Sequence, residues 1–177
     1  LFKKKKKNTY GIEVGKDSYN LAKKKHKMFY GNFDNKLKIN KKFDLIIMRG
    51  VIEHVDYPAK HVLRAQKFLK KNGYIFISAT PDADSIAAKI FKERWTLHKP
   101  ETHILHLTER HVDQLFAKKE FIKVGTKSLY LSTPYENFYD DILNFTKEIR
   151  KQKLRIKSSL ISPPFFGSMM TVIYKKN

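Results

Sequence analysis

FDLIIMRGVIEHVDYP occupies residues 43–58 and decides the fold. Its first six residues, FDLIIM, are apolar apart from Asp44, and this run predicts a central strand buried on both faces by helices. A helix is expected over residues 58–70, where apolar residues recur at near-helical spacing. Pro58 suits the first turn, and Asn72-Gly73 supplies a stop signal. The segment therefore indicates one strand-to-helix unit of an α/β protein.

The same alternation continues on both sides of this segment. We expect further strands at residues 9–14, 28–30, 74–78, 121–130 and 169–174, and further helices at residues 17–25, 82–91, 108–118 and 135–154. The strand at residues 74–78 should end at the turn Thr80-Pro81, and Thr108 should be the N-cap of its helix. Strands that alternate with helices favour a doubly wound, mostly parallel sheet. We expect a single domain over residues 1–177, with residues 135–154 as a helical insertion near the substrate side. Ligands of such sheets bind beyond the carboxyl ends of the strands.

Composition restricts the class of function. The net charge of +20 could attract nucleic acid, but lysines are scattered over the whole chain, and this favours an ordinary solvated surface. The chain has no cysteine, which is typical of a reducing compartment and predicts the cytoplasm. Proline and glycine interrupt the uncharged segment 158–174, so no membrane span is expected. The lysine-rich start lacks the apolar stretch of a signal peptide. The oligomeric state is left open.

Two acidic positions suggest chemistry. Glu13 ends the first expected strand, where a carboxylate can accept both hydroxyls of a ribose, although an isolated acid at a strand end is often only a surface charge. Glu53 precedes His54, whose imidazole could take a proton from a hydroxyl. The Glu53-His54 pair could equally cap and pack the turn.

Histidines also gather between Trp95 and His106. His98, His103 and His106 match no standard zinc spacing, and no cysteine accompanies them, so we expect no metal there. The segment is either an aromatic and imidazole wall for a substrate or a packed loop before the next helix. The proline and aromatic residues at 133–135 and 163–166 are either part of the same wall or edge packing.

These motifs resemble the class I S-adenosylmethionine-dependent methyltransferases, and they are similar to the small-molecule branch that includes ubiquinone-biosynthesis and sugar methyltransferases. The resemblance rests on the FDLIIM strand, the EHVDYP turn, and FLKKNGYIFISATP at residues 68–81. YGIEV (residues 10–14) resembles the second strand of that family, and FYGNF (residues 29–33) resembles the end of the third. The resemblance implies S-adenosylmethionine as cofactor and methyl transfer as the reaction.

The resemblance also implies roles for particular residues. Glu13 would hold the ribose hydroxyls, Val14 would pack on the adenine, and Asn32 and Phe33 would meet its polar edge. Asn32 replaces the usual acid, which predicts a weaker hydrogen bond from an uncharged acceptor. Met48 and Arg49 would lie beside the methionine part of the cofactor, although Arg49 could instead pair with a surface acid. The substrate-side residues would be Trp95, His98 and His103.

One part of the family pattern is missing. Members of the family begin with a strand and a glycine-rich turn that approaches the cofactor closely. This sequence has no such motif, because Gly11 and Gly15 bracket the second strand of the family pattern and not the first. Either the N-terminus is truncated or the chain is a degenerate relative of the family; we favour a truncation, and we expect poor cofactor affinity. The leading hypothesis is methylation of a hydroxyl, amine or carboxyl group on a small-molecule or sugar-like acceptor. A basic nucleic-acid-binding or RNA-modifying module is the alternative, and a non-catalytic scaffold is a third.

Overall fold

The computed structural model describes residues 8–117 and 120–177. These residues divide into two compact units, one ending at Lys41 and the other spanning Lys42–Asn177. The end of the helix expected over residues 108–118 lies outside the described residues. None of the described helices is long and apolar enough to cross a membrane.

The first unit is a small strand–helix–strand motif. β1 (Tyr10–Glu13) is followed by α1 (Lys16–Ala22) and β2 (Lys27–Tyr30), and the two strands pair in parallel from Tyr10↔Lys27 to Glu13↔Tyr30. The Tyr10 and Phe29 rings stack across the pair, with centroids 6.2 Å apart. The helix ends three residues earlier than expected. Because the strands are parallel, Glu13 and the end of β2 lie at the same edge.

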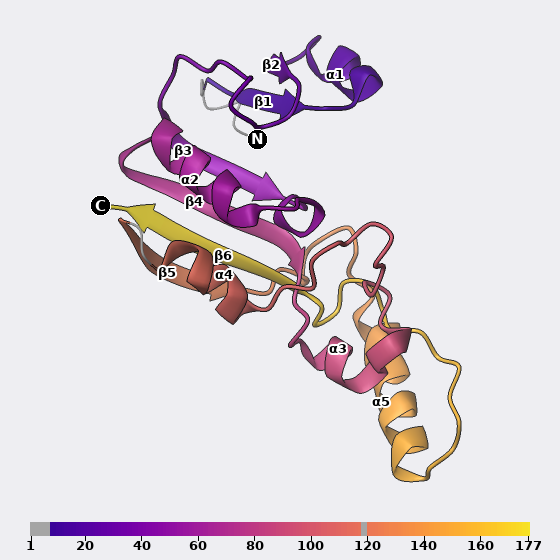
Figure 1. Cartoon of the computed structure of the whole chain (residues 1–177). Helices are drawn as coiled ribbons and strands as arrows, with labels where there is room; N and C mark the ends of the chain where they lie inside the picture. The colour runs from indigo at the N-terminus through magenta and orange to yellow at the C-terminus, as the bar shows by residue number, and fades with distance from the viewer. Residues whose placement is uncertain (1–7, 118–119) are drawn as a thin grey trace. The chain divides into compact units, whose positions relative to one another are not determined.

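The second unit contains a four-stranded sheet in the order β3-β4-β6-β5 (Figure 1). Its strands are β3 (Phe43–Arg49), β4 (Leu69–Pro81), β5 (Phe121–Lys127) and β6 (Met169–Lys176). β3 and β4 are parallel, whereas β6 is antiparallel to both β4 and β5. The sheet is therefore mixed rather than mostly parallel.

β6 runs antiparallel to its neighbours because of where the chain enters it. β4 ends at Pro81 and β5 at Lys127, and these ends pair with Met169 and Thr171, where β6 begins. The chain therefore leaves β5 and enters β6 on the same side of the sheet, where β4 and β5 have their carboxyl ends. β6 must then run back between its neighbours, which makes both pairings antiparallel.

β3 differs from the strand that its sequence predicts. It lies at an edge of the four-stranded sheet, because among the described residues only β4 pairs with it. Met48 is buried, but the Ile47 side chain is 49% exposed. The prediction of a central strand buried on both faces is therefore wrong for the described structure. An apolar run predicts that a strand is largely buried. It does not predict which strands pair with it.

β4 also departs from expectation. It begins at Leu69 and not at Tyr74, so Asn72-Gly73 lies inside the strand. The register with β3 shifts from Phe43↔Leu69 to Leu45↔Tyr74, which leaves the intervening residues of β4 in a bulge. Asn72 adopts the left-handed backbone conformation there, with φ of 57°. The stop signal at Asn72-Gly73 thus marks a bulge, whereas the strand ends at Pro81 as predicted.

Two helices cover one face of this sheet. α2 (Pro58–Phe68) and α4 (Glu109–Phe116) pack against each other on that face (Figure 1). α2 starts with Pro58 in its first turn and Thr108 is the N-cap of α4, as the sequence predicts, and His111 completes a capping box with Thr108. Phe116 stacks on Tyr174 of β6 with ring centroids 3.7 Å apart. The resulting arrangement is a Rossmann-like α/β sheet with a mixed strand order.

A second core lies beyond the carboxyl end of β4. α3 (Ile86–Phe91), the short helix η3 (Lys92–Arg94) and α5 (Phe138–Lys153) meet there, as Figure 1 shows. Ser85 caps α3 by accepting a hydrogen bond from the Ala88 amide. The core contains Ala87, Phe91, Trp95, Leu97 and Phe145. The helix expected over residues 135–154 is α5, and its Phe145 packs edge-on against Phe91 with ring centroids 5.2 Å apart.

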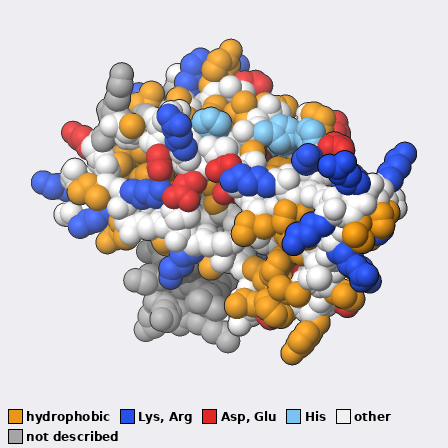
Figure 2. All heavy atoms as spheres, turned by 90° about the horizontal axis from the view of Figure 1, so that it is seen from below, with side chains coloured by type: hydrophobic (Ala, Val, Ile, Leu, Met, Phe, Trp, Pro, Cys, Tyr) orange, Lys and Arg blue, Asp and Glu red, His pale blue; other side chains and the backbone are white. Residues whose placement is uncertain are grey.

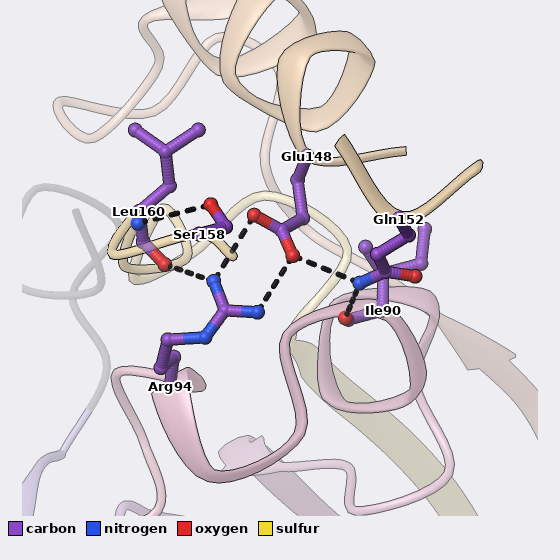
Figure 3. A network of polar contacts seen from close by, with 6 residues as sticks. All are labelled: Ile90, Arg94, Glu148, Gln152, Ser158 and Leu160. Carbon is purple, nitrogen blue, oxygen red and sulfur yellow. Dashed lines mark hydrogen bonds and ion pairs between the residues drawn. The ribbon is translucent and has the colours of Figure 1, made fainter. Parts of the chain in front are cut away.

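A buried ion pair joins α5 to η3 (Figure 3). Arg94 donates to both carboxylate oxygens of Glu148, at 2.6 and 3.0 Å, and to the Leu160 carbonyl oxygen at 2.7 Å. Gln152 donates to Glu148 and to the Ile90 carbonyl oxygen. The Glu148 side chain is fully buried. A bidentate pair of this kind fixes both distance and orientation, so it holds the segment that leads into Trp95.

The Glu148 carboxylate predicts acid sensitivity. Hydrogen bonds from Arg94 lower its pKa from 4.5 to about 2. Because the folded pKa is depressed, this stabilisation is fully present above pH 4.5 and is lost as the pH falls toward about 2. Urea unfolding across that range should show the wild-type protein losing stability faster than Glu148→Gln. If the free energy of unfolding fell equally with pH in both proteins, the depressed pKa of Glu148 would be contradicted.

Candidate active site

The first unit places two predicted cofactor residues next to each other. Glu13 ends β1, and its carbonyl oxygen accepts a hydrogen bond from the Gly31 amide at 3.0 Å, directly before Asn32. The Glu13 carboxylate accepts a hydrogen bond from the Gly15 amide at 2.8 Å. A carboxylate can accept further hydrogen bonds beyond this one. Glu13 and Asn32 therefore form a polar edge at the carboxyl ends of two parallel strands.

The other predicted residues of this unit differ in exposure. Val14 is 58% exposed, Asn32 is exposed, and Phe33 is half-buried. An exposed valine beside a carboxylate offers an apolar surface next to a hydrogen-bond acceptor. That combination suits a nucleoside, which has a flat base and a hydroxylated sugar.

In the second unit, Met48 and Arg49 end β3. Met48 is 5% exposed, whereas Arg49 is exposed. Within residues 8–117 and 120–177, Arg49 forms no ion pair with an acid, so the alternative of a surface salt bridge is not observed. The chain turns at Gly50, whose φ of 58° favours glycine, and the Gly50 amide donates to the Ser78 carbonyl oxygen of β4.

The turn after β3 brings Glu53 and His54 into a short helix, η2 (Ile52–His54). The Glu53 side chain is 2% exposed, and its Oε2 accepts a hydrogen bond from the Thr80 hydroxyl at 3.2 Å. It therefore turns into the core and does not cap the turn. His54 remains 41% exposed, and its Nδ1 lies 2.6 Å from the Thr102 carbonyl oxygen.

The histidine-rich loop lies against this turn. His103 Nδ1 is 2.9 Å from the Leu97 carbonyl oxygen, and the His103 ring lies 4.9 Å from the ring of His54. The Leu105 amide donates to the Glu53 carbonyl oxygen at 3.2 Å. Two motifs that the sequence analysis treated separately thus form one cluster of polar groups at the carboxyl end of the sheet.

The remaining predicted substrate residues, Trp95 and His98, differ in exposure. Trp95 is 5% exposed, packs in the second core and donates from Nε1 to the Ser168 hydroxyl at 3.1 Å. Its ring therefore has little surface to offer an acceptor. His98 is exposed and packs edge-on against His106, with ring centroids 4.9 Å apart. Figure 2 shows several histidine side chains together at the surface. Of these residues, His98 and His103 are accessible and Trp95 supports the loop.

The proline and aromatic segments behave as packing elements. Tyr135 stacks on Phe165 with ring centroids 4.0 Å apart, and Phe166 packs against Phe145 of α5. Sequence reasoning missed Thr80, which orients Glu53, and the pair Arg94–Glu148, which holds the loop. The threonine before Pro81 was visible at a strand end, but nothing in the local pattern links residues 54 positions apart.

The fold is a Rossmann-like α/β sheet with polar side chains at the carboxyl ends of its parallel strands. A family model described as a methyltransferase domain matches residues 1–124. The chain therefore belongs to the methyltransferase domain family, and it is an S-adenosylmethionine-dependent methyltransferase by class. No curated protein is a significant match.

Solved structures share the fold at low sequence identity. An S-adenosylmethionine-dependent methyltransferase from Archaeoglobus fulgidus is 16% identical with a TM-score of 0.66, covering 99% of this chain and 79% of its own. A possible histamine N-methyltransferase from Thermotoga maritima is 19% identical with a TM-score of 0.57, covering 95% and 72%. Magnesium protoporphyrin IX methyltransferase from Synechocystis PCC 6803, with bound S-adenosylhomocysteine, is 10% identical with a TM-score of 0.58, covering 95% and 64%.

Proposed function

We propose that this chain methylates a hydroxyl, amine or carboxyl group of a small-molecule or sugar-like acceptor. The observation that carries the proposal is the placement of polar side chains in each unit, because they follow the carboxyl ends of parallel strands. That is the end at which open α/β sheets bind their ligands. The cofactor already carries the activated methyl group, so the protein has to orient the acceptor and remove a proton.

The cofactor side is assigned from the family resemblance. Glu13 would accept hydrogen bonds from the ribose hydroxyls, and Val14 would pack on the adenine. Asn32 and Phe33 would meet the polar edge of the base. Met48 and Arg49 would lie beside the methionine part. Val14 and Asn32 are exposed and Glu13 is half-buried at the carboxyl ends of β1 and β2, which supports this assignment.

The acceptor side would use the histidine loop. With Nδ1 of His54 donating to the Thr102 carbonyl, Nε2 keeps its lone pair and can take a proton from a hydroxyl acceptor. His98 and His103 would contact the acceptor, and Trp95 would hold the loop from beneath. The lack of cysteine in the whole sequence supports a reducing compartment, and we propose the cytoplasm.

Labelled methyl groups identify the acceptor class. Two incubations contain the protein and S-adenosyl[methyl-³H]methionine. One also contains pooled small hydroxyl, amine and carboxyl compounds, and the other contains total RNA. We expect label in the small-molecule fraction and none above background in RNA. Label that appears in RNA alone would overturn the proposal.

The net charge of +20 favours one alternative, a nucleic-acid-binding or RNA-modifying module. On the face that Figure 2 shows, Lys and Arg side chains are interspersed with other types and do not form a continuous stripe. We therefore expect only weak RNA binding, which falls steeply as salt rises, whereas binding of S-adenosylhomocysteine changes little. Fluorescence anisotropy at several salt concentrations checks this. RNA binding that is strong at low salt and falls steeply as salt rises would favour the alternative.

A further inference from the structure

We propose that Glu53, His54 and His103 bind a divalent transition-metal cation. One ligand atom from each side chain lies within 4.8 Å of the others. All three residues belong to the second unit, at the carboxyl end of β3 and in the loop that packs on it. The spacing of His98, His103 and His106 alone predicts no metal.

Both imidazoles are oriented for metal binding. Nδ1 of His54 and Nδ1 of His103 each lie within hydrogen-bond distance of a backbone carbonyl oxygen, at 2.6 and 2.9 Å. A carbonyl only accepts, so each Nδ1 carries the proton and each Nε2 keeps a lone pair. Metal-binding histidines usually have their second nitrogen held in this way, which fixes the tautomer and the ring direction.

Within residues 8–117 and 120–177, the Glu53 carboxylate pairs with no lysine or arginine, and its one ion-pair contact is with the His54 imidazole. It is 2% exposed, and the Thr80 hydroxyl bonds only to Oε2. Oε1 faces His54 Nε2 at 3.8 Å, beyond hydrogen-bond distance. Burying a carboxylate is costly unless an opposite charge or several hydrogen bonds compensate. A cation between Oε1 and the two imidazoles would supply that charge.

Metal binding requires the three ligand atoms, now within 4.8 Å of one another, to move closer together. Two ligands of a tetrahedral ion with bonds of about 2.0–2.1 Å lie roughly 3.3 Å apart, which is close to the 3.8 Å between Glu53 Oε1 and His54 Nε2. The loop is tied to η2 because the Leu105 amide donates to the Glu53 carbonyl oxygen, and the His103 amide donates to the Lys99 carbonyl oxygen at 2.7 Å. These backbone bonds hold the three side chains near their binding positions.

The donor set selects the kind of cation. Two imidazoles and one carboxylate suit Zn²⁺, Co²⁺ or Ni²⁺ better than Mg²⁺ or Ca²⁺, which prefer oxygen ligands. Three protein ligands leave a coordination position open to water. An acceptor oxygen could take that position, a step that rests on the proposed methyl transfer. In the metal-loaded protein His54 Nε2 is a ligand, so it acts as a proton acceptor only when the metal is absent.

Titration with Zn²⁺ and Co²⁺ tests the site without cofactor or acceptor. Isothermal calorimetry should give one ion per chain, and Co²⁺ should develop the visible absorption of a low-coordinate complex. Loss of a residue that only hydrogen-bonds a metal ligand typically weakens metal affinity by roughly 10–100-fold. His54→Gln, His103→Gln and Glu53→Gln should each weaken binding by more than this. His98→Gln, in the same loop, is the matched control and should bind like wild type.

Folding of each variant is checked by circular dichroism and by thermal unfolding without metal. Zn²⁺ should raise the unfolding temperature of the wild type and of His98→Gln, and not that of the three ligand variants. In the wild-type protein, Zn²⁺ should also shift the imidazole resonances of His54 and His103, which requires no variant. The proposal is overturned if the wild type binds no ion, or if His98→Gln loses binding while His103→Gln keeps it. Because no methyl transfer is measured, failure here leaves the proposed function intact.

Discussion

Replacing Glu148 with glutamine lowers the free energy of unfolding by about 3 kcal/mol. The substitution keeps the shape of the side chain and removes its charge, which leaves the Arg94 guanidinium without its partner. Arg94 is 25% exposed and Glu148 is fully buried, so water replaces the lost interaction only in part. Urea denaturation at neutral pH gives the free energy of unfolding of both proteins.

An exposed ion pair supplies the control for this prediction. Lys89 and Asp84 lie 2.8 Å apart, with side chains 60% and 66% exposed. Asp84→Asn should cost at most about 1 kcal/mol, because solvent screens such a pair. If Glu148→Gln proves as mild as Asp84→Asn, the network in Figure 3 does not hold α5 to η3.

Replacing Glu13 with glutamine weakens binding of S-adenosylhomocysteine by at least about tenfold. A carboxylate forms hydrogen bonds to hydroxyls that are worth roughly 1.5–3 kcal/mol each, compared with about 0.5–1.5 kcal/mol for an uncharged acceptor. Glutamine can still accept the hydrogen bond from the Gly15 amide through its side-chain oxygen, so the local turn is retained. Ligand titration followed by NMR measures dissociation constants even when the affinity is poor.

Asp17 provides the matched control for Glu13. It is an exposed acid in the first turn of α1, in the same unit, and has the same charge. Asp17→Asn should leave the dissociation constant within about twofold of wild type, because long-range charge effects are screened. Equal weakening by both substitutions would indicate a general electrostatic effect and not a ribose contact.

Local signals predicted most elements of the fold. Pro58 at the start of α2, Thr108 as the cap of α4 and Pro81 at the end of β4 are all found where expected. These signals depend on a few neighbouring residues, which the sequence shows directly. The edge position of β3 and the reversed direction of β6 depend on pairing between distant segments. Apolar periodicity contains no information about such pairing.

The candidate site shows the same division. Glu13 and His54 were identified because strand ends and turn motifs are local features. The burial of Glu53 against Thr80, and the contact between His54 and His103, join segments that are 27 and 49 residues apart. Only the folded chain brings them together. The metal proposal therefore depends on the structure, whereas the cofactor residues follow from the sequence.

Photolabelling with S-adenosyl[methyl-³H]methionine, followed by peptide mapping, tests the central claim that strand-end residues bind the cofactor. Ultraviolet cross-linking captures weak complexes as well as tight ones. We predict that label appears in peptides covering residues 9–33 and 43–49, and that excess S-adenosylhomocysteine removes it. Label confined to residues 121–177, or label that the competitor leaves unchanged, would contradict the account.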